Sequence, residues 1–354
     1  MLKKATGWLL VCASMAIGIS CATTSSHYLY AALPTASEIV AYREDPNSGV
    51  LTLLSVSPIA AGPAVQALAL HPSKKYLYAA NSFENDVSLF TIASSGVLTE
   101  VTPRPKTDTT PTLLAMDPAG KFLYVGNSGA NDLSVFSIDA GSGTLTPVSN
   151  SPFQLQMTPT NIEVSPSGSF LYVTGSGLPG NVEVFSLSAG QLSIVQVAQV
   201  GTNPYGLAID SSGAHLYVAN SSPDNSISEF TVDATTGLLT LATTTGGGTL
   251  TSPVGLLIDN SGKYLFVANA GASNLSAYAI ASDGSLSLLT TNSSVPTNAH
   301  PSFLVSDPNG KYLFVGNASS PAIQSFSLNP GTGTLTAVTS YSIADTATSI
   351  VVVP

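Results

Sequence analysis

The chain has 354 residues, of which 44% are hydrophobic and only 8% are charged, and its formal net charge is −10. This length is enough to bury one large core or two ordinary ones. The acidic balance and the presence of only two arginines, Arg43 and Arg104, exclude the clustered basic surface that nucleic-acid binding requires. We therefore expect no nucleic-acid partner.

Residues 1–20 have the pattern of a signal peptide. Lys3 and Lys4 precede an apolar run from Trp8 to Ile19, which is too short to span a bilayer comfortably. The segment Gly18-Ile19-Ser20-Cys21-Ala22 then resembles a bacterial lipobox, in which the cysteine becomes the acylated first residue of a lipoprotein. This pattern predicts export and a lipid anchor at Cys21.

Cleavage before Cys21 would leave residues 21–27 as a short polar tether. It would also remove Cys12 and two lysines, so the mature chain would keep one thiol, no intramolecular disulfide and a net charge of −12. We expect a membrane-anchored lipoprotein of the cell envelope. The alternative is an ordinary secretory leader, which would give a secreted or periplasmic protein.

A self-similar segment then recurs seven times along the chain. Its period is 45 to 49 residues, which matches one four-stranded propeller blade and is too long for leucine-rich or ankyrin repeats. Each copy opens with an aromatic residue or histidine, then leucine, then tyrosine or phenylalanine. The copies begin at Tyr28, Tyr76, Phe122, Phe170, His215, Tyr264 and Tyr312.

Each unit contains four short β-prone runs separated by turn residues. In the third unit the runs are 113–116, 122–125, 133–138 and 145–148. The segment Asp117-Pro118-Ala119-Gly120-Lys121 is typical of a tight turn between the first two runs. The segment from Asp139 to Gly143 lacks the later glutamate of a calcium loop, so we predict a hairpin turn with Asx hydrogen bonds there.

The two ends of the repeat region complement each other. The first unit begins at Tyr28 without an innermost strand, and the run from Ser349 to Val353 supplies one. This closure removes exposed sheet edges and predicts an all-β fold over residues 28–354, a seven-bladed β-propeller with four antiparallel strands per blade, closed by the C-terminal strand.

Two further positions recur in each unit. Proline suits the first residue of a strand, where no ladder donor is lost; the residues that lead the innermost strands are Val65, Pro111, Pro159, Pro204, Pro253, Pro301 and Ala347. Asparagine ends five second strands, and we predict that its side chain braces the following loop. These asparagines are Asn81, Asn127, Asn220, Asn269 and Asn317.

The Leu-Tyr-Val-x-Asn strands and Pro-x-Gly-Lys turns resemble the lactonase family of seven-bladed propellers, which includes 6-phosphogluconolactonase-like and cycloisomerase-like proteins. They are also similar to surface-layer propellers with Tyr-Val-Thr-Asn (YVTN) repeats. The resemblance implies a histidine after the strand-leading proline and arginine and glutamate in the central pocket. Here the residues after the prolines are instead Thr112, Thr160, Tyr205, Val254 and Ser302.

The loops that enter the first strands and those that join the second to the third strands should meet at one face. Polar candidates there are Glu38, Glu84, Asp86, Lys106, Asp108, Asp132, Tyr205, Asp224, His300 and Asp345. His300 and Asp345 precede innermost strands of adjacent repeats, so they could form a hydrogen-bonded catalytic pair or remain two solvated loop residues. Tyr205, Asp108 and Asp132 are the candidate ligand-binding residues.

No metal or cofactor site is expected from the motifs. His71 and His215 should lie at the face opposite His300, which argues against a three-histidine centre. With the family's usual catalytic residues missing, the sequence favours a binding or scaffold module at the cell envelope, with a small molecule or an envelope protein as partner. The alternatives are a lactonase-like hydrolase acting on a sugar lactone or other uncharged lactone, and a surface-layer or adhesion protein.

Overall fold

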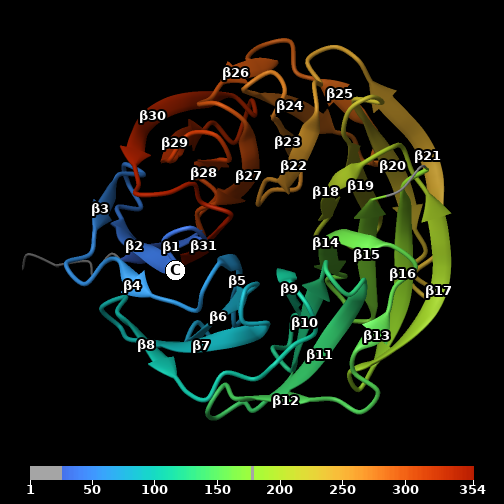
Figure 1. Cartoon of the computed structure of the whole chain (residues 1–354). Helices are drawn as coiled ribbons and strands as arrows, with labels where there is room; N and C mark the ends of the chain where they lie inside the picture. The colour runs from blue at the N-terminus through green and yellow to red at the C-terminus, as the bar shows by residue number, and fades with distance from the viewer. Residues whose placement is uncertain (1–25, 177–178) are drawn as a thin grey trace, which may run out of the picture.

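The computed structural model describes residues 26–176 and 179–354, and Figure 1 shows their seven sheets arranged in a ring. Every sheet has four antiparallel strands, and three sheets carry one additional short strand. The predicted seven-bladed β-propeller is therefore confirmed. In the part of the chain that the structure describes, no helix has the length and hydropathy to cross a membrane.

The first four blades, each from the innermost strand outward, are as follows. Blade 1 contains β31 (Ser349–Val353), β1 (His27–Leu33), β2 (Glu38–Glu44) and β3 (Leu51–Leu53). Blade 2 contains β5 (Val65–Leu70), β6 (Tyr76–Asn81), β7 (Asp86–Ile92) and β8 (Leu98–Val101). Blade 3 contains β9 (Pro111–Met116), β10 (Phe122–Asn127), β11 (Asp132–Ile138) and β12 (Leu145–Pro147). Blade 4 contains β14 (Thr158–Val164), β15 (Phe170–Ser176), β16 (Asn181–Ser188) and β17 (Gln191–Gln199).

The remaining three blades repeat this order. Blade 5 contains β18 (Pro204–Ile209), β19 (His215–Asn220), β20 (Ser226–Val232) and β21 (Leu239–Gly246). Blade 6 contains β22 (Pro253–Ile258), β23 (Tyr264–Asn269), β24 (Asn274–Ile280) and β25 (Leu286–Leu288). Blade 7 contains β27 (Pro301–Ser306), β28 (Tyr312–Asn317), β29 (Ala322–Leu328) and β30 (Leu335–Ser342).

Three short strands were not predicted from the sequence. They are β4 (Ile59–Ala60), β13 (Phe153–Gln154) and β26 (Ser294–Pro296), and each pairs with the third strand of its blade. In blade 1, Pro58 stands just before β4 and cannot donate to the ladder. The Ser57 hydroxyl accepts the hydrogen bond of the Ala41 amide there, at 2.9 Å. The outer strand is thus interrupted and then resumes its pairing.

Turn residues have the roles that the sequence predicts. One carboxylate oxygen of Asp117 accepts hydrogen bonds from the amides of Lys121 and Phe122, both at 2.6 Å. Gly120 in this turn has a φ of +66°, which a side chain would strain. Asp139 accepts hydrogen bonds from its own hairpin, including the Ser142 amide at 2.8 Å. The predicted Asx hairpin is confirmed.

The C-terminal strand closes the ring as predicted. Residues of β31 pair with β1 in antiparallel register, from Tyr28 opposite Val353 to Ala32 opposite Ser349. β1 begins at His27, one residue before the expected start of the propeller. The expected signal peptide and Cys21 lie outside the described residues.

The asparagines that end the second strands brace the following loops, as expected. The Asn127 amide donates to Asp132 Oδ1 at 2.6 Å and to Ser134 Oγ at 2.9 Å. Equivalent bonds recur at Asn81, Asn220 and Asn269, and in blade 7 the Asn317 amide donates to a backbone carbonyl. These side chains fix the loops at one face of the ring.

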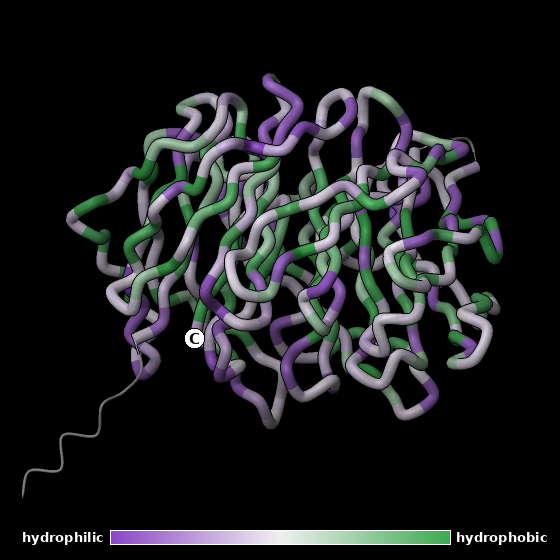
Figure 2. Tube along the Cα trace, turned by 90° about the horizontal axis from the view of Figure 1, so that it is seen from below, coloured by the Kyte–Doolittle hydropathy of each residue, from purple (hydrophilic) through white to green (hydrophobic). Residues whose placement is uncertain are grey.

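The core lies between neighbouring blades, not within one of them. Second strands are buried on both faces, as β6 shows with all six residues buried, whereas β21 and β30 on the outside are largely exposed. One cluster joins Tyr78 and Val87 of blade 2 to Leu123 and Val125 of blade 3. Figure 2 shows the ring edge on, with many hydrophilic segments in the loops at its two faces.

Buried tyrosines in the second strands reach the outer hairpin of the next blade. The hydroxyls of Tyr30, Tyr78 and Tyr217 donate to glycine carbonyls at 2.7, 2.7 and 2.8 Å. Tyr172 is equally buried, but its hydroxyl has no hydrogen-bond partner among the described residues. These two situations at equivalent positions provide a direct test of the inter-blade bonds.

We predict that Tyr78→Phe lowers the free energy of unfolding by about 1–2 kcal/mol, because it leaves the buried Gly143 carbonyl without its donor. Tyr172→Phe should change it by less than about 0.5 kcal/mol or stabilise the protein, because no bond is lost. Urea denaturation of both variants beside the wild type measures the difference. Equal losses in the two variants would contradict this role.

Candidate functional site

The innermost strands share an irregularity in six of the seven blades. In blades 2 to 7 the register against the second strand shifts directly after the strand-leading residue, so that the next residue is a bulge. A bulge turns a side chain out of the regular alternation and is common beside functional sites. The bulged residues are Gln66, Thr112, Thr160, Tyr205, Val254 and Ser302.

A cavity of about 640 Å³, here called the central cavity, lies where these strands begin. It is lined by Thr160, Asn161, Tyr205, Val254, Ala270, His300, Ser302, Phe303, Ala318, Ser319, Thr346, Ala347 and Thr348. A second cavity of about 220 Å³ shares Asn161, Phe303 and Thr348 with it and is otherwise lined by innermost-strand residues. Both cavities therefore follow the inner wall of the ring.

The central cavity has an uncharged, hydroxyl-rich lining. Five of its residues are threonine or serine: Thr160 and Ser302 in innermost strands, Thr346 and Thr348 just before β31, and Ser319 in the loop after β28. Asn161 adds a carboxamide. Neither cavity has an aspartate, glutamate, lysine or arginine among its lining residues. Aromatic surface comes from Phe303 and from Tyr205, whose side chain is 44% exposed. Such a lining can hydrogen-bond and stack against a neutral molecule that carries hydroxyl groups.

Contacts between blades hold Tyr205 in place. The Asn161 amide of blade 4 donates to the Tyr205 carbonyl at 3.0 Å, and the Thr160 hydroxyl donates to the carbonyl of Pro204. Sequence analysis did not select Asn161. The available signal was its departure from the repeat, because no other blade has a carboxamide at this position. The equivalent residues are Ser349, Ala67, Leu113, Gly206, Gly255 and Phe303.

His300 lies at the cavity, because it directly precedes Pro301, the first residue of the innermost strand β27. Its φ is +55°, and the residues that precede the strand-leading position in four other blades are also left-handed: Ala64, Thr110, Asn203 and Ser252. Its carbonyl accepts a hydrogen bond from the Ala318 amide at 2.7 Å. The backbone geometry of His300 is therefore that of the repeat, and His300 is one of the residues that line the central cavity.

The expected hydrogen bond between His300 and Asp345 does not form among the described residues. The Asp345 carboxylate instead accepts hydrogen bonds from the backbone amides of Thr35 at 2.6 Å and Thr346 at 2.7 Å. Asp345 is absent from the described cavity lining, although the next residue, Thr346, belongs to it. The physical reason is that the β1–β2 turn offers unpaired amides, which a carboxylate caps readily.

Asp108 and Asp132 lie beside each other, but outside the central cavity lining. Burial and the neighbouring Asp108 carboxylate together raise the pKa of Asp132 to about 6, against the opposing effect of the hydrogen bond from Asn127. The backbone amide of Thr109, at 2.7 Å, lowers the pKa of Asp108. Of the three expected ligand-binding residues, only Tyr205 reaches the cavity.

A family model described as lactonase, seven-bladed β-propeller, matches residues 21–157, 151–254 and 243–352. The chain belongs to this lactonase family. The matched segments cover the seven blades, in agreement with the resemblance of the strands and turns. No curated protein matches the chain by sequence.

Solved structures of this lactonase fold resemble the chain closely in shape. A candidate 6-phosphogluconolactonase from Bacteroides uniformis has a TM-score of 0.82 at 20% identity, over 93% of this chain and 100% of that chain. The periplasmic gluconolactonase of Pseudomonas aeruginosa has a TM-score of 0.78 at 19% identity, over 93% and 99%. A protein from Lactobacillus plantarum has a TM-score of 0.80 at 20% identity, over 93% and 99%. At these identities the likeness establishes the fold alone.

We predict that Asp132→Asn stabilises the protein at pH 8. The pKa of Asp132, about 6 when folded, lies above its unfolded value of about 3.9, so its ionisation weakens the fold as the pH rises through this interval. The variant keeps an acceptor for Asn127 and should gain up to about 2 kcal/mol at pH 8, with no gain below about pH 4. Thermal unfolding across this pH range measures the effect.

Asp86 provides the control, because it ends the same brace in blade 2. Its carboxylate pairs with the Lys106 ammonium at 3.0 Å. In blade 3 the residue that stands opposite Asp132 is Gln154, which carries no charge. Asp86→Asn should therefore give no stabilisation at pH 8. Asp86 is as buried as Asp132 but faces a cation instead of a second carboxylate. A gain of the same size in both variants would therefore show that these neighbouring charges are not the cause.

Proposed function

We propose that this lactonase-family propeller is a binding module whose central cavity takes a neutral, hydroxyl-bearing small molecule such as a sugar or a sugar lactone. The observation that carries the proposal is the cavity lining, which offers hydroxyls, the Asn161 amide and the rings of Tyr205 and Phe303 but no charged carboxylate, ammonium or guanidinium group. Saccharide hydroxyls pair with such donors and acceptors, and their apolar faces stack on aromatic rings.

A phosphorylated ligand suits this cavity poorly, because phosphate recognition usually uses arginine or lysine. Arg104 is bonded to Glu100 at 2.7 Å and lies 3.6 Å from Glu84, far from the cavity lining. Lys106 is paired with Asp86. Arg43 lines a different hollow, beside blade 1. The basic side chains are thus placed where they cannot neutralise a bound phosphate in the central cavity.

Lactone hydrolysis is the second candidate function, and His300 is the observation that favours it. His300 lines the cavity, and an imidazole there could activate water toward an uncharged lactone. The similarity in fold to a periplasmic gluconolactonase agrees with an uncharged substrate. The residues after the strand-leading prolines do not include the histidine that the family resemblance implies, which favours binding over hydrolysis.

We expect isothermal titration calorimetry with a panel of neutral mono- and disaccharides to find one ligand whose affinity falls at least tenfold in Tyr205→Ala, about 1.4 kcal/mol. Phe83→Ala is the matched control, because Phe83 is an aromatic residue that is 78% exposed in a loop outside the cavity lining. Equal losses in the two variants, or tighter binding of the 6-phosphorylated sugar, would rule out the proposed site.

The same preparations decide between binding and hydrolysis. If the cavity only binds, opening of glucono-δ-lactone and of acyl lactones should proceed at the spontaneous rate in the presence of wild-type protein. Turnover above that rate which His300→Ala abolishes would establish the hydrolase instead. Turnover that His300→Ala leaves unchanged would exclude His300 as the base.

We also propose that the chain is exported and anchored to a membrane of the cell envelope through Cys21. The support is the lipobox-like segment in the sequence, together with the direction in which β1 enters the fold. The start of β1 pairs with Val353, the last residue of β31. The cavity residues Thr346 and Thr348 lie next to Ser349, at the opposite end of β31. The chain therefore enters the propeller at the face opposite the cavity. An anchor attached before β1 would thus leave the cavity facing away from the membrane.

Radiolabelled palmitate should label the wild-type chain, and Cys21→Ser should abolish the label and release the protein from the membrane fraction. Cys12→Ser is the control, because Cys12 lies within the expected signal peptide and its loss should leave labelling unchanged. Label that persists in Cys21→Ser would refute acylation at this residue.

A further inference from the structure

Blade 1 departs from the repeat at two positions that face each other. His27 of β1 is paired with Glu44 of β2 in the strand register. The residues equivalent to Glu44 in blades 2 to 7 are all aliphatic: Ile92, Ile138, Leu187, Val232, Ile280 and Leu328. The residues opposite them are Lys75, Lys121, Ser169, Ala214, Lys263 and Lys311. Blade 1 alone has a histidine and a carboxylate here.

A second carboxylate comes from the neighbouring blade. Asp307 lies in the turn between β27 and β28 of blade 7, where its oxygens accept hydrogen bonds from the amides of Asn309, Lys311 and Tyr312 at 3.0, 2.6 and 2.7 Å. One donor atom from each of His27, Glu44 and Asp307 lies within 4.8 Å of the other two. Turn aspartates recur in other blades, but their next blade has an aliphatic residue in place of Glu44.

The three side chains are buried, and one carboxylate oxygen among them lacks a hydrogen-bond partner. His27, Glu44 and Asp307 are 2%, 1% and 0% exposed. Glu44 Oε2 lies 3.1 Å from His27 Nδ1, whereas Glu44 Oε1 has no hydrogen-bond partner among the described residues. A buried carboxylate oxygen without a partner is costly, and a ligand that supplied positive charge would remove the cost.

We propose that His27, Glu44 and Asp307 bind a divalent transition-metal cation of the zinc type, which ties blade 7 to blade 1 at the ring closure. One imidazole nitrogen and two carboxylate oxygens are donors that Zn²⁺ accepts, with water in a fourth position. Magnesium and calcium prefer sites made of oxygen alone, so the imidazole disfavours them. The cation would join residues that are 263 positions apart in sequence.

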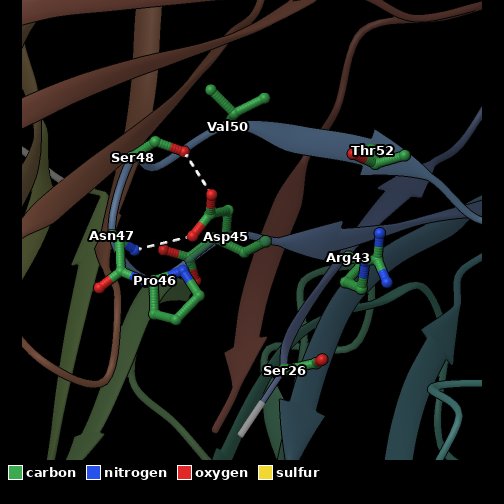
Figure 3. Close-up of a pocket in the computed structure, with 9 residues that line it drawn as sticks. Ser26, Arg43, Asp45, Pro46, Asn47, Ser48, Val50 and Thr52 are labelled. Carbon is green, nitrogen blue, oxygen red and sulfur yellow. Dashed lines mark hydrogen bonds between the residues drawn. The ribbon is translucent and has the colours of Figure 1, made fainter. Parts of the chain in front are cut away.

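The cation can reach the site through a hollow of about 530 Å³ that Glu44 helps to line. Figure 3 shows this hollow, with Ser26, Arg43 and Asp45 around it and with Asp45 bonded to Asn47 and Ser48 of its own turn. Asp45 is exposed, and its carboxylate is not among the donor atoms that converge at the cluster, so it is not counted as a ligand. An entry path is one of the requirements of a real metal site.

The charges around the cluster favour the binding of a cation. Burial, together with the neighbouring carboxylates of Asp307 and Asp45, raises the pKa of Glu44 to about 8. Burial also lowers the pKa of His27, as does Lys74 on the next blade, against the opposing effect of Asp307. The 3.1 Å contact between His27 Nδ1 and Glu44 Oε2 requires one proton between the two atoms. Below pH 8 the Glu44 carboxyl carries a proton in addition to that of the neutral imidazole, and a cation bound to both side chains would release the Glu44 proton to solvent.

The test is titration of ZnCl2 into the full chain, purified without a polyhistidine tag and freed of metal by a chelator. We expect uptake of one Zn²⁺ per chain and, at a hundredfold excess over Kd, a rise in Tm of about 5 °C. Calorimetry in two buffers of different ionisation enthalpy should show proton release. Parallel titrations with MgCl2 and CaCl2 should give no comparable rise.

Glu44→Gln keeps the shape and an acceptor for His27 but loses the anionic ligand, so the Zn²⁺-dependent rise in Tm should disappear. The double variant His27→Lys with Glu44→Ile carries the pair found in blade 2 at Lys75 and Ile92. It should fold and show no response to Zn²⁺. This second variant keeps the test valid if the single variant is poorly folded.

Two controls should retain the response. His215→Asn removes the other histidine–carboxylate pair, whose partner Asp210 lies 2.9 Å away. Replacing Cys12 and Cys21 by serine removes both thiols of the chain. The proposal is overturned if the wild type shows no saturable, equimolar Zn²⁺ uptake, or if the double variant binds Zn²⁺ as tightly as the wild type.

Discussion

Hydrogen bonding between β1 and β31 is the interaction on which the rest of the ring depends. Each blade buries its faces only against its two neighbours, so seven blades in a row would leave two hydrophobic faces open at the ends. The pairing of Tyr28 to Ala32 with Ser349 to Val353 builds one blade from both ends of the chain and brings blade 7 against blade 1. The closure thereby converts a repeat array, whose contacts are otherwise local, into a single cooperative unit.

The closed ring has two faces, and the loops at the two faces have different structural roles. At one face the innermost strands begin, their bulges turn side chains toward the axis, and the asparagine braces fix the adjacent loops. At the other face the turn aspartates satisfy backbone amides and leave few side chains free. A ligand site at the first face can therefore vary from blade to blade without loss of the fold, because the bulged residues have no partner in the ladder.

The sequence was sufficient to predict the blades and the turns, because their patterns recur along the chain, and to predict the closure, because the first unit lacks an innermost strand that the C-terminal run supplies. Asp117 and Gly120 specify the same turn wherever they appear, and five asparagines end the second strands in the same way. The short strand β4 was missed because it depends on where the outer strand is interrupted at Pro58. A period of about 47 residues carries no information on such single interruptions.

The residues of the site were predicted less well than the fold. The sequence assigned residues to one face of the ring, and only some of the residues at that face line the cavity. Tyr205 and His300 were placed at the cavity by their position beside the strand-leading prolines. Asp108, Asp132 and Asp345 belong to the same face, but their carboxylates are occupied by loop amides, by a brace or by one another. Blade order alone could not reveal this, since it fixes an angle around the axis and leaves the distance from it undetermined.

Departures from the repeat are the more informative signal for function in such a protein. A residue that all seven blades share serves the blade itself, whereas a polar residue in one blade at an aliphatic position has a cost that the fold does not explain. Asn161 stands where the other blades have small or apolar residues, and it lines the cavity and holds Tyr205. Glu44 and His27 depart in the same way, and they do so together, at the junction where the ring has to be closed. Because His27 and Glu44 are buried and in contact, we look for one physical cause of both departures. An isolated His27–Glu44 pair is not a sufficient cause, because it leaves one buried Glu44 oxygen without a hydrogen-bond partner. A ligand shared by the two side chains would satisfy that oxygen.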